Sequence, residues 1–246
     1  MNSLLKLTLI DIKLYLRNYV ATFFTFVFPL LMLVLFGGVY GNKPEPIFGG
    51  YGSMDITVPG YIATLIIGST AFMSLPMDLA FQRQLGVLRR MRATPLHPAV
   101  VMGSKMITNL LVAVFGTALL VFAGAAIYQA YIPAAWLPVF LGILLSCLCL
   151  FSLGFALASL VRSANAVRAV SFVVFYPMMF FSGGTIPGQF LPPAVQTIAE
   201  VMPMTYTVNL VRDLWFGKGW DLTTVAVLVG FTIAGILISV RFFRWE

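Results

Sequence analysis

Five long stretches without a charged residue constrain this chain more than any other feature of its sequence. They run over residues 18–42, 56–77, 106–161, 169–199 and 222–240. A helix that crosses a bilayer needs ~20 apolar residues, and one Lys, Arg or Asp at its centre costs roughly 2.5–3.5 kcal/mol. Each stretch is long enough for at least one crossing. Only 9% of the 246 residues are charged, against about 25% in soluble domains, which excludes a water-soluble enzyme.

The number of crossings follows from the helix breakers inside these stretches. Residues 106–161 suffice for two crossings, and a turn with Tyr131 and Pro133 separates them. Residues 169–199 hold one crossing, because a Gly-Gly pair and a proline end any regular helix. The six predicted spans are about 20–40, 57–78, 106–128, 136–161, 168–182 and 222–240. The chain is therefore predicted to be an all-α polytopic membrane protein with a single transmembrane domain over residues 1–246.

The basic residues are divided unevenly between the two sides of such a bundle. An even number of spans places both termini on one side, and 12 of the 15 basic residues fall there. The other three are Lys43, Arg212 and Lys218. The positive-inside rule then predicts cytoplasmic termini in a cell membrane. The net charge of +7 is explained by these anchors, and no nucleic-acid partner is expected.

A short amphipathic helix is predicted before the first span, over about residues 3–17. At 100° per residue, its leucines and its cations fall on different faces. The apolar face holds Leu5, Leu9, Ile12 and Leu16, and the cationic face holds Lys6, Lys13 and Arg17. Such a helix suits the cytoplasmic membrane interface. A simple topology anchor explains the same cations equally well.

A second amphipathic helix is predicted between the second and third spans, over about residues 79–92. Phe81, Leu85 and Leu88 recur at i, i+4 and i+7, with two arginines on the opposite face. A Thr-Pro pair at 94–95 follows, where proline cannot continue the helix. The apolar stripe suits docking on a partner or on the membrane surface, and the spacing fits both.

The segment before the last span, about residues 184–217, is mostly apolar and rich in proline. This composition excludes a polar ectodomain and favours two short helices that enter the outer leaflet without crossing it, as a re-entrant hairpin. The predicted helices are Pro193–Met202 and Thr205–Phe216, with Thr205 as N-cap of the second.

The chemistry of catalysis is missing from the sequence. Gly103-Ser104-Lys105 lacks the upstream glycine of a phosphate-binding loop. The single histidine, His97, has no other metal-ligating residue near it in the sequence. No catalytic residue and no metal site are predicted. The nearest titratable group to a span is Asp78, which a helix end beside Arg83 explains. An ion-coupled carrier needs a titratable site in its spans, so it stays the alternative rather than the preferred interpretation.

The second and fifth spans carry adaptable apolar side chains that could face a transported compound. Those predicted to line a pathway are Phe72, Met73, Phe175, Tyr176 and Met179. Pro177 removes a backbone hydrogen bond in the fifth span and predicts a gating kink. Contact with lipid is the default alternative for each side chain. Close helix packing is predicted at Ser152 and Gly154 in the fourth span and at Gly230 and Ala234 in the last.

Two stretches resemble a known family. FQRQLGVLRRMRATPLHPAVVMGSK, residues 81–105, is similar to the loop between the second and third spans of the type-2 ATP-binding-cassette (ABC) exporter permeases. FFSGGTIPGQFLPPAVQTIAEVMPMTYTVNLVRDLWFG, residues 180–217, resembles the outer element of the same family. The six spans and the interfacial helix also agree. The family loop carries glutamates near its glycine, where this chain has Gln82 and Gln84, so the charge pairing with a partner differs.

The resemblance implies a permease that dimerises with an identical or homologous second copy. Two ABC ATPase subunits would supply the energy, and ATP and Mg would be bound by them rather than by this chain. The residues expected to couple to the ATPase are Phe81, Gln82, Arg83, Gln84, Leu85, Leu88, Arg89 and Arg90. Together with the apolar pathway residues, the resemblance predicts export of an amphipathic or lipid-like compound, such as a drug, an antibiotic or a lipid-linked saccharide.

Overall fold

The computed structural model describes residues 3–92, 98–161, 163–186 and 188–242. These residues form helices and connecting turns, with no β-strand among them. Six helical segments are long and apolar enough to cross a membrane, which confirms the predicted number and the all-α polytopic class. They are Tyr19–Tyr40, Pro46–Gln84, Val100–Tyr128, Trp136–Leu160, Ala164–Phe181 and Leu222–Phe242.

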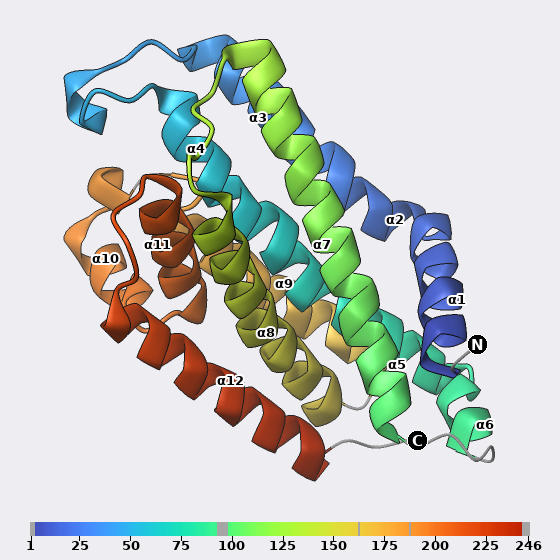
Figure 1. Ribbon diagram of the computed structural model, residues 1–246. Coiled ribbons are helices and arrows are strands. Elements are labelled where there is room, and N and C mark those ends of the chain that lie inside the picture. Colours follow the sequence, from blue (N-terminus) through green and yellow to red (C-terminus); the bar gives the residue numbers. More distant parts are fainter. Residues whose placement is uncertain (1–2, 93–97, 162, 187, 243–246) are drawn as a thin grey trace.

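The second of these segments forms the centre of the bundle (Figure 1). It consists of α4 (Ser53–Tyr61), the π-helical turns η3 (Ile62–Gly68) and η4 (Thr70–Ser74), and α5 (Leu75–Gln84). Its side chains from Ile62 to Met73 are buried. The helices around it are α3 (Phe28–Tyr40), α7 (Pro98–Tyr128), α8 (Trp136–Leu160), α9 (Ala164–Phe181) and α11 (Pro203–Trp215). An uncharged sequence without polar alternation suits burial on all sides.

Small residues let these helices approach closely. A Cβ added at Gly154 would lie 2.1 Å from the Ala71 carbonyl oxygen, so α8 touches the backbone of the second span there. The last span, α12 (Leu222–Phe242), packs along α8, where a Cβ at Gly235 would lie 2.5 Å from Ser152 Oγ. Gly230, predicted as a packing position, has open space around its Cβ, so that prediction is wrong. The helix turns Gly230 away from α8 and Gly235 toward it.

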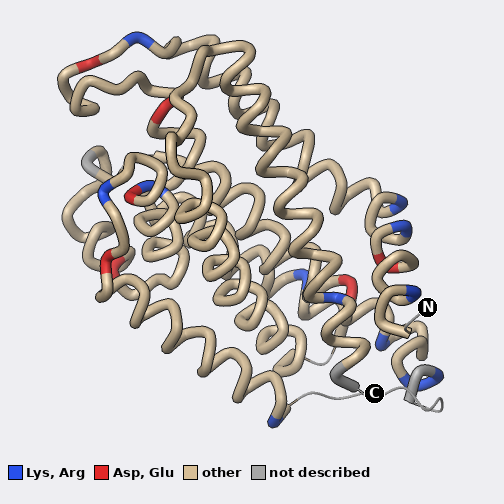
Figure 2. The backbone as a smooth tube through the Cα atoms, viewed as in Figure 1, with Lys and Arg blue, Asp and Glu red and all other residues tan. Residues whose placement is uncertain are grey.

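The two ends of the bundle differ in the elements they hold. At one end lie α1 (Ser3–Arg17), the end of α5, α6 (Val87–Arg92) and the end of α12; this is called the α1 end. At the other lie α10 (Pro193–Ala199) and α11, called the α11 end. Figure 2 shows that the charged residues lie mostly toward these ends, as a membrane-spanning bundle requires.

Candidate functional site

The segment predicted as one helix over 79–92 is divided in two. α5 ends at Gln84 and α6 begins at Val87, because Gly86 between them has a left-handed backbone conformation with φ of 69°. Glycine adopts this conformation without steric cost. The prediction of a continuous helix is therefore wrong, since one glycine within an apolar repeat does not show a break. The Thr-Pro ending at 94–95 lies outside the described residues.

The break separates the predicted apolar stripe into an exposed and a buried part. Phe81 and Leu85 are 57% and 52% exposed, whereas Leu88 is fully buried. Leu88 thus belongs to the core, and its predicted place on a docking face is wrong. We call the exposed side chains of this segment the coupling patch: Phe81, Gln84, Leu85, Arg89 and Arg90. Large exposed apolar groups beside cations are typical of a surface that binds another protein or the membrane surface.

Arg83, predicted to couple to the ATPase, points into the bundle instead. Its Nη2 donates to the Ala158 carbonyl (2.7 Å) and its Nη1 to the Val161 carbonyl (3.1 Å). These carbonyls end α8, where the last backbone oxygens lack partners within the helix. The guanidinium therefore ties the end of the second span to the end of the fourth.

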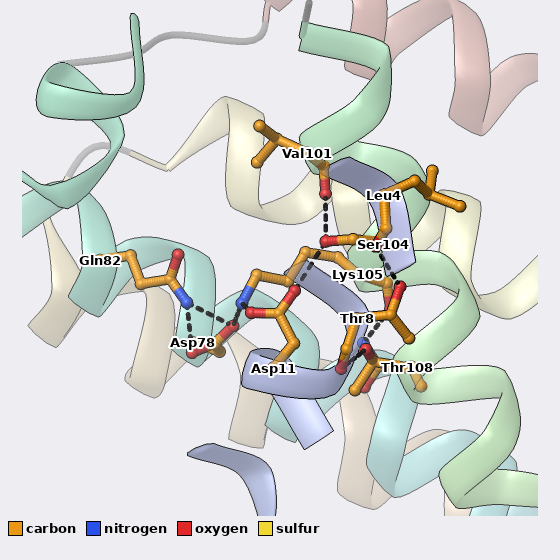
Figure 3. Close-up of polar contacts among 10 residues, drawn as sticks. Leu4, Thr8, Asp11, Asp78, Gln82, Val101, Ser104, Lys105 and Thr108 are labelled. Atoms are coloured by element: carbon orange, nitrogen blue, oxygen red, sulfur yellow. Dashed lines mark hydrogen bonds and ion pairs between the residues drawn. The ribbon is translucent and has the colours of Figure 1, made fainter. Parts of the chain in front are cut away.

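A buried ion cluster that sequence reasoning missed lies beside this segment (Figure 3). Lys105 Nζ lies 2.6 Å from Asp11 Oδ1 and 2.8 Å from Asp78 Oδ2. Lys105 is one of the 12 basic residues that the positive-inside rule counts on one side of the bundle, but α7 begins at Pro98, so this lysine already lies two turns inside the helix. A signal was available: Asp11 is the only acidic residue in an otherwise basic helix.

Further polar groups extend the cluster. Ser104 Oγ donates to Asp11 Oδ2 (2.7 Å), and Gln82 Nε2 donates to both carboxylate oxygens of Asp78 (3.0 Å each). One turn beyond Asp11, the Tyr15 hydroxyl lies 2.7 Å from Thr25 Oγ1 and donates to Ser74 Oγ (3.2 Å). Burial raises the pKa of Tyr15, so the phenol stays neutral. We call Asp11, Tyr15, Asp78, Gln82, Ser104 and Lys105 together the α1 cluster.

The predicted pathway residues lie side by side, but mostly inside the single chain. Phe72, Met73, Phe175 and Met179 are each buried in the hydrophobic core. Tyr176 is half-buried and stacks against another ring of α9, that of Phe172, with centroids 5.6 Å apart. The structure thus brings the second and fifth spans together.

An apolar groove of about 490 Å³ lies nearby, between α3 and the end of α9. Its walls include Phe28, Met32, Phe36, Val39, Met179 and Phe180. Met179 is the one predicted pathway residue that borders it. α9 continues through Pro177 to Phe181, and the gating role of Pro177 stays a prediction.

The segment before the last span folds into the two short helices α10 and α11. α11 begins at Pro203 with Met202 as its N-cap, so the predicted cap at Thr205 is wrong. The Thr205 hydroxyl instead donates to the carbonyl of Ala199 (2.7 Å), which joins α11 to the end of α10. Proline at the first helical position explains the earlier start. The re-entrant placement in a leaflet stays a prediction.

Arg212 on α11 holds the turn that follows α9. Its Nη2 donates to the Gly183 carbonyl (2.9 Å), and burial lowers the pKa of the guanidinium. The next residue, Gly184, packs so closely that a Cβ at Gly60 would lie 2.2 Å from its carbonyl oxygen. The turn predicted at this Gly-Gly pair thus packs against both the second span and α11.

A metal site is not formed by the described residues, among which no three His, Cys, Asp or Glu side chains come together. His97 lies outside them. The described geometry places an exposed patch at the α1 end beside ion pairs that link α5 to α7 and α1.

Comparison with known proteins gives a consistent result. A sequence model of the ABC-2 type transporter family matches residues 3–216. The chain is 26% identical to a putative transport permease, ycf38, of Porphyra purpurea, over 87% of this chain and 75% of the relative. It is also 26% identical to a probable doxorubicin resistance ABC transporter permease protein, DrrC, of Mycobacterium tuberculosis, over 82% of this chain and 72% of the relative. A daunorubicin resistance ABC transporter permease protein, DrrB1, of Streptomyces coeruleorubidus shares 24% identity, over 89% and 76%.

Proposed function

Since the chain belongs to the ABC-2 type transporter family, and is therefore the membrane subunit of an ABC transporter, we propose that it exports an amphipathic or lipid-like compound. Permeases of this family work with an ABC ATPase. In this proposal, two copies of the ATPase subunit bind ATP and Mg. A second permease, identical or homologous, pairs with this chain. The termini and the α1 end would then face the cytoplasm of a cell in whose plasma membrane the chain lies.

The coupling patch is the observation that carries this proposal. Phe81 and Leu85 expose more than half of their surface at the α1 end, next to the cations Arg89 and Arg90. Apolar groups at the end of a membrane bundle gain free energy when a protein partner covers them. The sequence has no phosphate-binding loop, which fits a separate subunit that binds the ATP.

The apolar character of the second and fifth spans supports the substrate class. Aromatic and methionine side chains adapt to varied apolar shapes. The groove between α3 and α9 adds an apolar surface open to a lipid-like molecule, with Met179 at its edge. Two of the relatives are named for resistance to doxorubicin and to daunorubicin, which fits export of a drug-like compound.

A co-purification experiment tests the function. The chain is expressed with its ATPase, reconstituted in liposomes, and compared with a Leu85→Asp variant. We expect ATPase binding at least roughly tenfold weaker in the variant, because a charge in the centre of an interface removes a main contact. Ile47→Asp is the matched control. Ile47 is also exposed, by 56%, but it lies in the short helix Pro46–Phe48 and not in the coupling patch. Equal binding and ATP-driven flux in both variants would contradict the proposal.

The alternative is an ion-coupled secondary carrier. The α1 cluster is the observation that favours it, because buried carboxylates beside a lysine can serve as an ion site. Liposomes without ATP or ATPase decide between the two functions. Flux driven by a proton gradient alone would establish the carrier, and flux that requires both ATP and the ATPase would establish the exporter.

A further inference from the structure

Three elements that are distant in sequence meet around a single ammonium group. Lys105 of α7 contacts Asp11 of α1 at 2.6 Å and Asp78 of α5 at 2.8 Å (Figure 3). The side chains of Lys105 and Asp11 are 5% and 7% exposed, so this leg of the bridge is shielded from solvent. Asp78 is 39% exposed and forms the open side.

The bridge continues directly into the segment that carries the coupling patch. Asp78 accepts from Gln82, one turn further along α5, and Gln82 lies next to Phe81 in sequence. On the other side, Ser104 fixes the second oxygen of Asp11. Each carboxylate thus has a lysine and a neutral donor, which orients it and lowers the cost of burial.

The bridge also reaches the first span through α1. Tyr15 lies one turn after Asp11 on the same helix face, and its hydroxyl contacts Thr25 in the first span and Ser74 in the second. The fully buried side chains of α1, Thr8 and Asp11, are therefore polar, whereas Leu5, Leu9 and Leu16 are exposed. A helix that only rested on the membrane would need no buried carboxylate.

Buried ion pairs contribute little net stability, because desolvation offsets most of their attraction. Apolar side chains of the same size hold helices together at least as well. What the charges add is a defined geometry, since an ammonium with two carboxylates has one arrangement in which both are satisfied. The cluster is thus better suited to keep three helix ends in register than to stabilise the fold.

We propose that the Asp11–Lys105–Asp78 bridge is a positioning device that makes α1 follow α5. Displacement of the coupling patch would pass through Asp78 to Lys105 and α7, from there to Asp11, and through Tyr15 to the first span. The interfacial helix α1 then takes part in transmitting the movement to the spans. This inference rests on the proposed function, because it requires that a partner moves the coupling patch.

The test removes the charges in a matched pair, so that no buried ion is left alone. The Asp11→Asn/Lys105→Met variant is reconstituted with the ATPase and assayed for ATPase binding, ATP hydrolysis and export. We expect ATPase binding to be unchanged, while export per ATP hydrolysed falls roughly tenfold, within the range of couplings between distant sites. The control is Asp213→Asn/Lys218→Met, which removes an exposed ion pair of 3.1 Å at the α11 end. Export per ATP equal to wild type in both variants would overturn the bridge.

A cross-link separates a mechanical role from a chemical one and also covers poor folding of the double variant. Thr108 Oγ1 donates to the Thr8 carbonyl (3.4 Å), so Thr8→Cys and Thr108→Cys place two thiols between α1 and α7. In an Asp11→Asn background, oxidation should restore export per ATP toward the wild-type value, and reduction should lower it again. Export that stays low in the oxidised protein would overturn the positioning role, because α1 is then held without its charge.

The outcomes for the wild-type protein keep the two proposals apart. Wild-type chain that shows no ATP-driven export contradicts the proposed function itself. If the wild-type chain exports with ATP and the double variant exports as much per ATP hydrolysed, only the bridge is contradicted.

Discussion

The α1 end and the α11 end of this bundle are held together by different forces. At the α1 end, the buried Asp11 of α1 and the partly exposed Asp78 of α5 both pair with Lys105 of α7. At the α11 end, backbones touch: the carbonyl of Gly184 lies where a Cβ of Gly60 would be, and Arg212 donates to a backbone carbonyl. The helix contacts at the α1 end thus depend on charge, and those at the α11 end depend on close packing, that is, on shape.

This difference has a consequence for motion. Close-packed backbones tolerate almost no displacement before atoms overlap. Lys105 instead joins helices through a flexible side chain, which can swing with them while its ion pairs with Asp11 and Asp78 stay formed. The α1 end is therefore the end at which movement of an attached partner can be received. The α11 end is the fixed end, against which α9 and the second span are positioned.

The largest expected loss of unfolding free energy comes from Lys105→Met, which removes the cation at the α1 end. Asp11, with 7% of its side chain exposed, would be left without its cation, and an unpaired buried charge costs about 3–5 kcal/mol of the free energy of unfolding. The measurement is unfolding with SDS in mixed micelles. Lys218→Met, at an exposed ion pair, should cost about 0–1 kcal/mol. Equal losses in the two variants would show that charge does not hold the α1 end.

The second effect comes from Gly60→Ala at the shape-held end. The new Cβ would lie 2.2 Å from the Gly184 carbonyl oxygen, and overpacking of this kind costs about 1–3 kcal/mol. The matched control is Gly230→Ala in α12, where no atom lies within 4 Å of the added Cβ. That variant should gain up to about 1 kcal/mol, because alanine favours the helix. The same unfolding measurement compares them, and an unchanged Gly60→Ala variant would refute the shape argument.

Sequence patterns predicted the spans well because their physical basis is local. A run of uncharged residues shows a crossing wherever it lies; α12 begins at Leu222, where its run begins, and α8 begins at Trp136, just after the predicted turn. The break at Gly86 was missed, because only the surrounding structure shows that this glycine adopts a left-handed conformation rather than continuing the helix.

The candidate site was predicted less completely, because its contacts are long-range. Periodicity placed Phe81 and Leu85 on one face, and they are exposed together. It could not show that Leu88 turns into the core, nor that Asp11 and Lys105 meet across 94 residues of sequence. Opposite charges near the ends of different helices were visible, but the sequence does not state which ends become neighbours. Three-dimensional packing decides that pairing.

A smaller effect is expected from Arg212→Met. The variant loses a hydrogen bond from a charged group, worth about 1.5–3 kcal/mol, but it also relieves the desolvation that lowers the pKa of Arg212. The net loss of unfolding free energy should be about 1 kcal/mol. A loss as large as that of Lys105→Met would show that charge also holds the α11 end, and the contrast between the ends would disappear.

The smallest effect concerns Asp221, a charge at the α11 end that acts only locally. Its carboxylate caps α12 by accepting from Thr224 Oγ1 (2.6 Å) and from the backbone N–H of Thr224 (3.0 Å), and these bonds hold the pKa of Asp221 below its usual value. A carboxyl whose pKa is lowered by folding stabilises the fold fully above its unfolded pKa, and this contribution is lost as the pH falls through the folded pKa. Thermal midpoints of wild type and Asp221→Asn, compared between about pH 6 and pH 3, should converge as the pH falls, because the variant keeps a cap but no charge. A difference that persists at low pH would mean that the cap acts by shape rather than by charge, as the rest of the α11 end does.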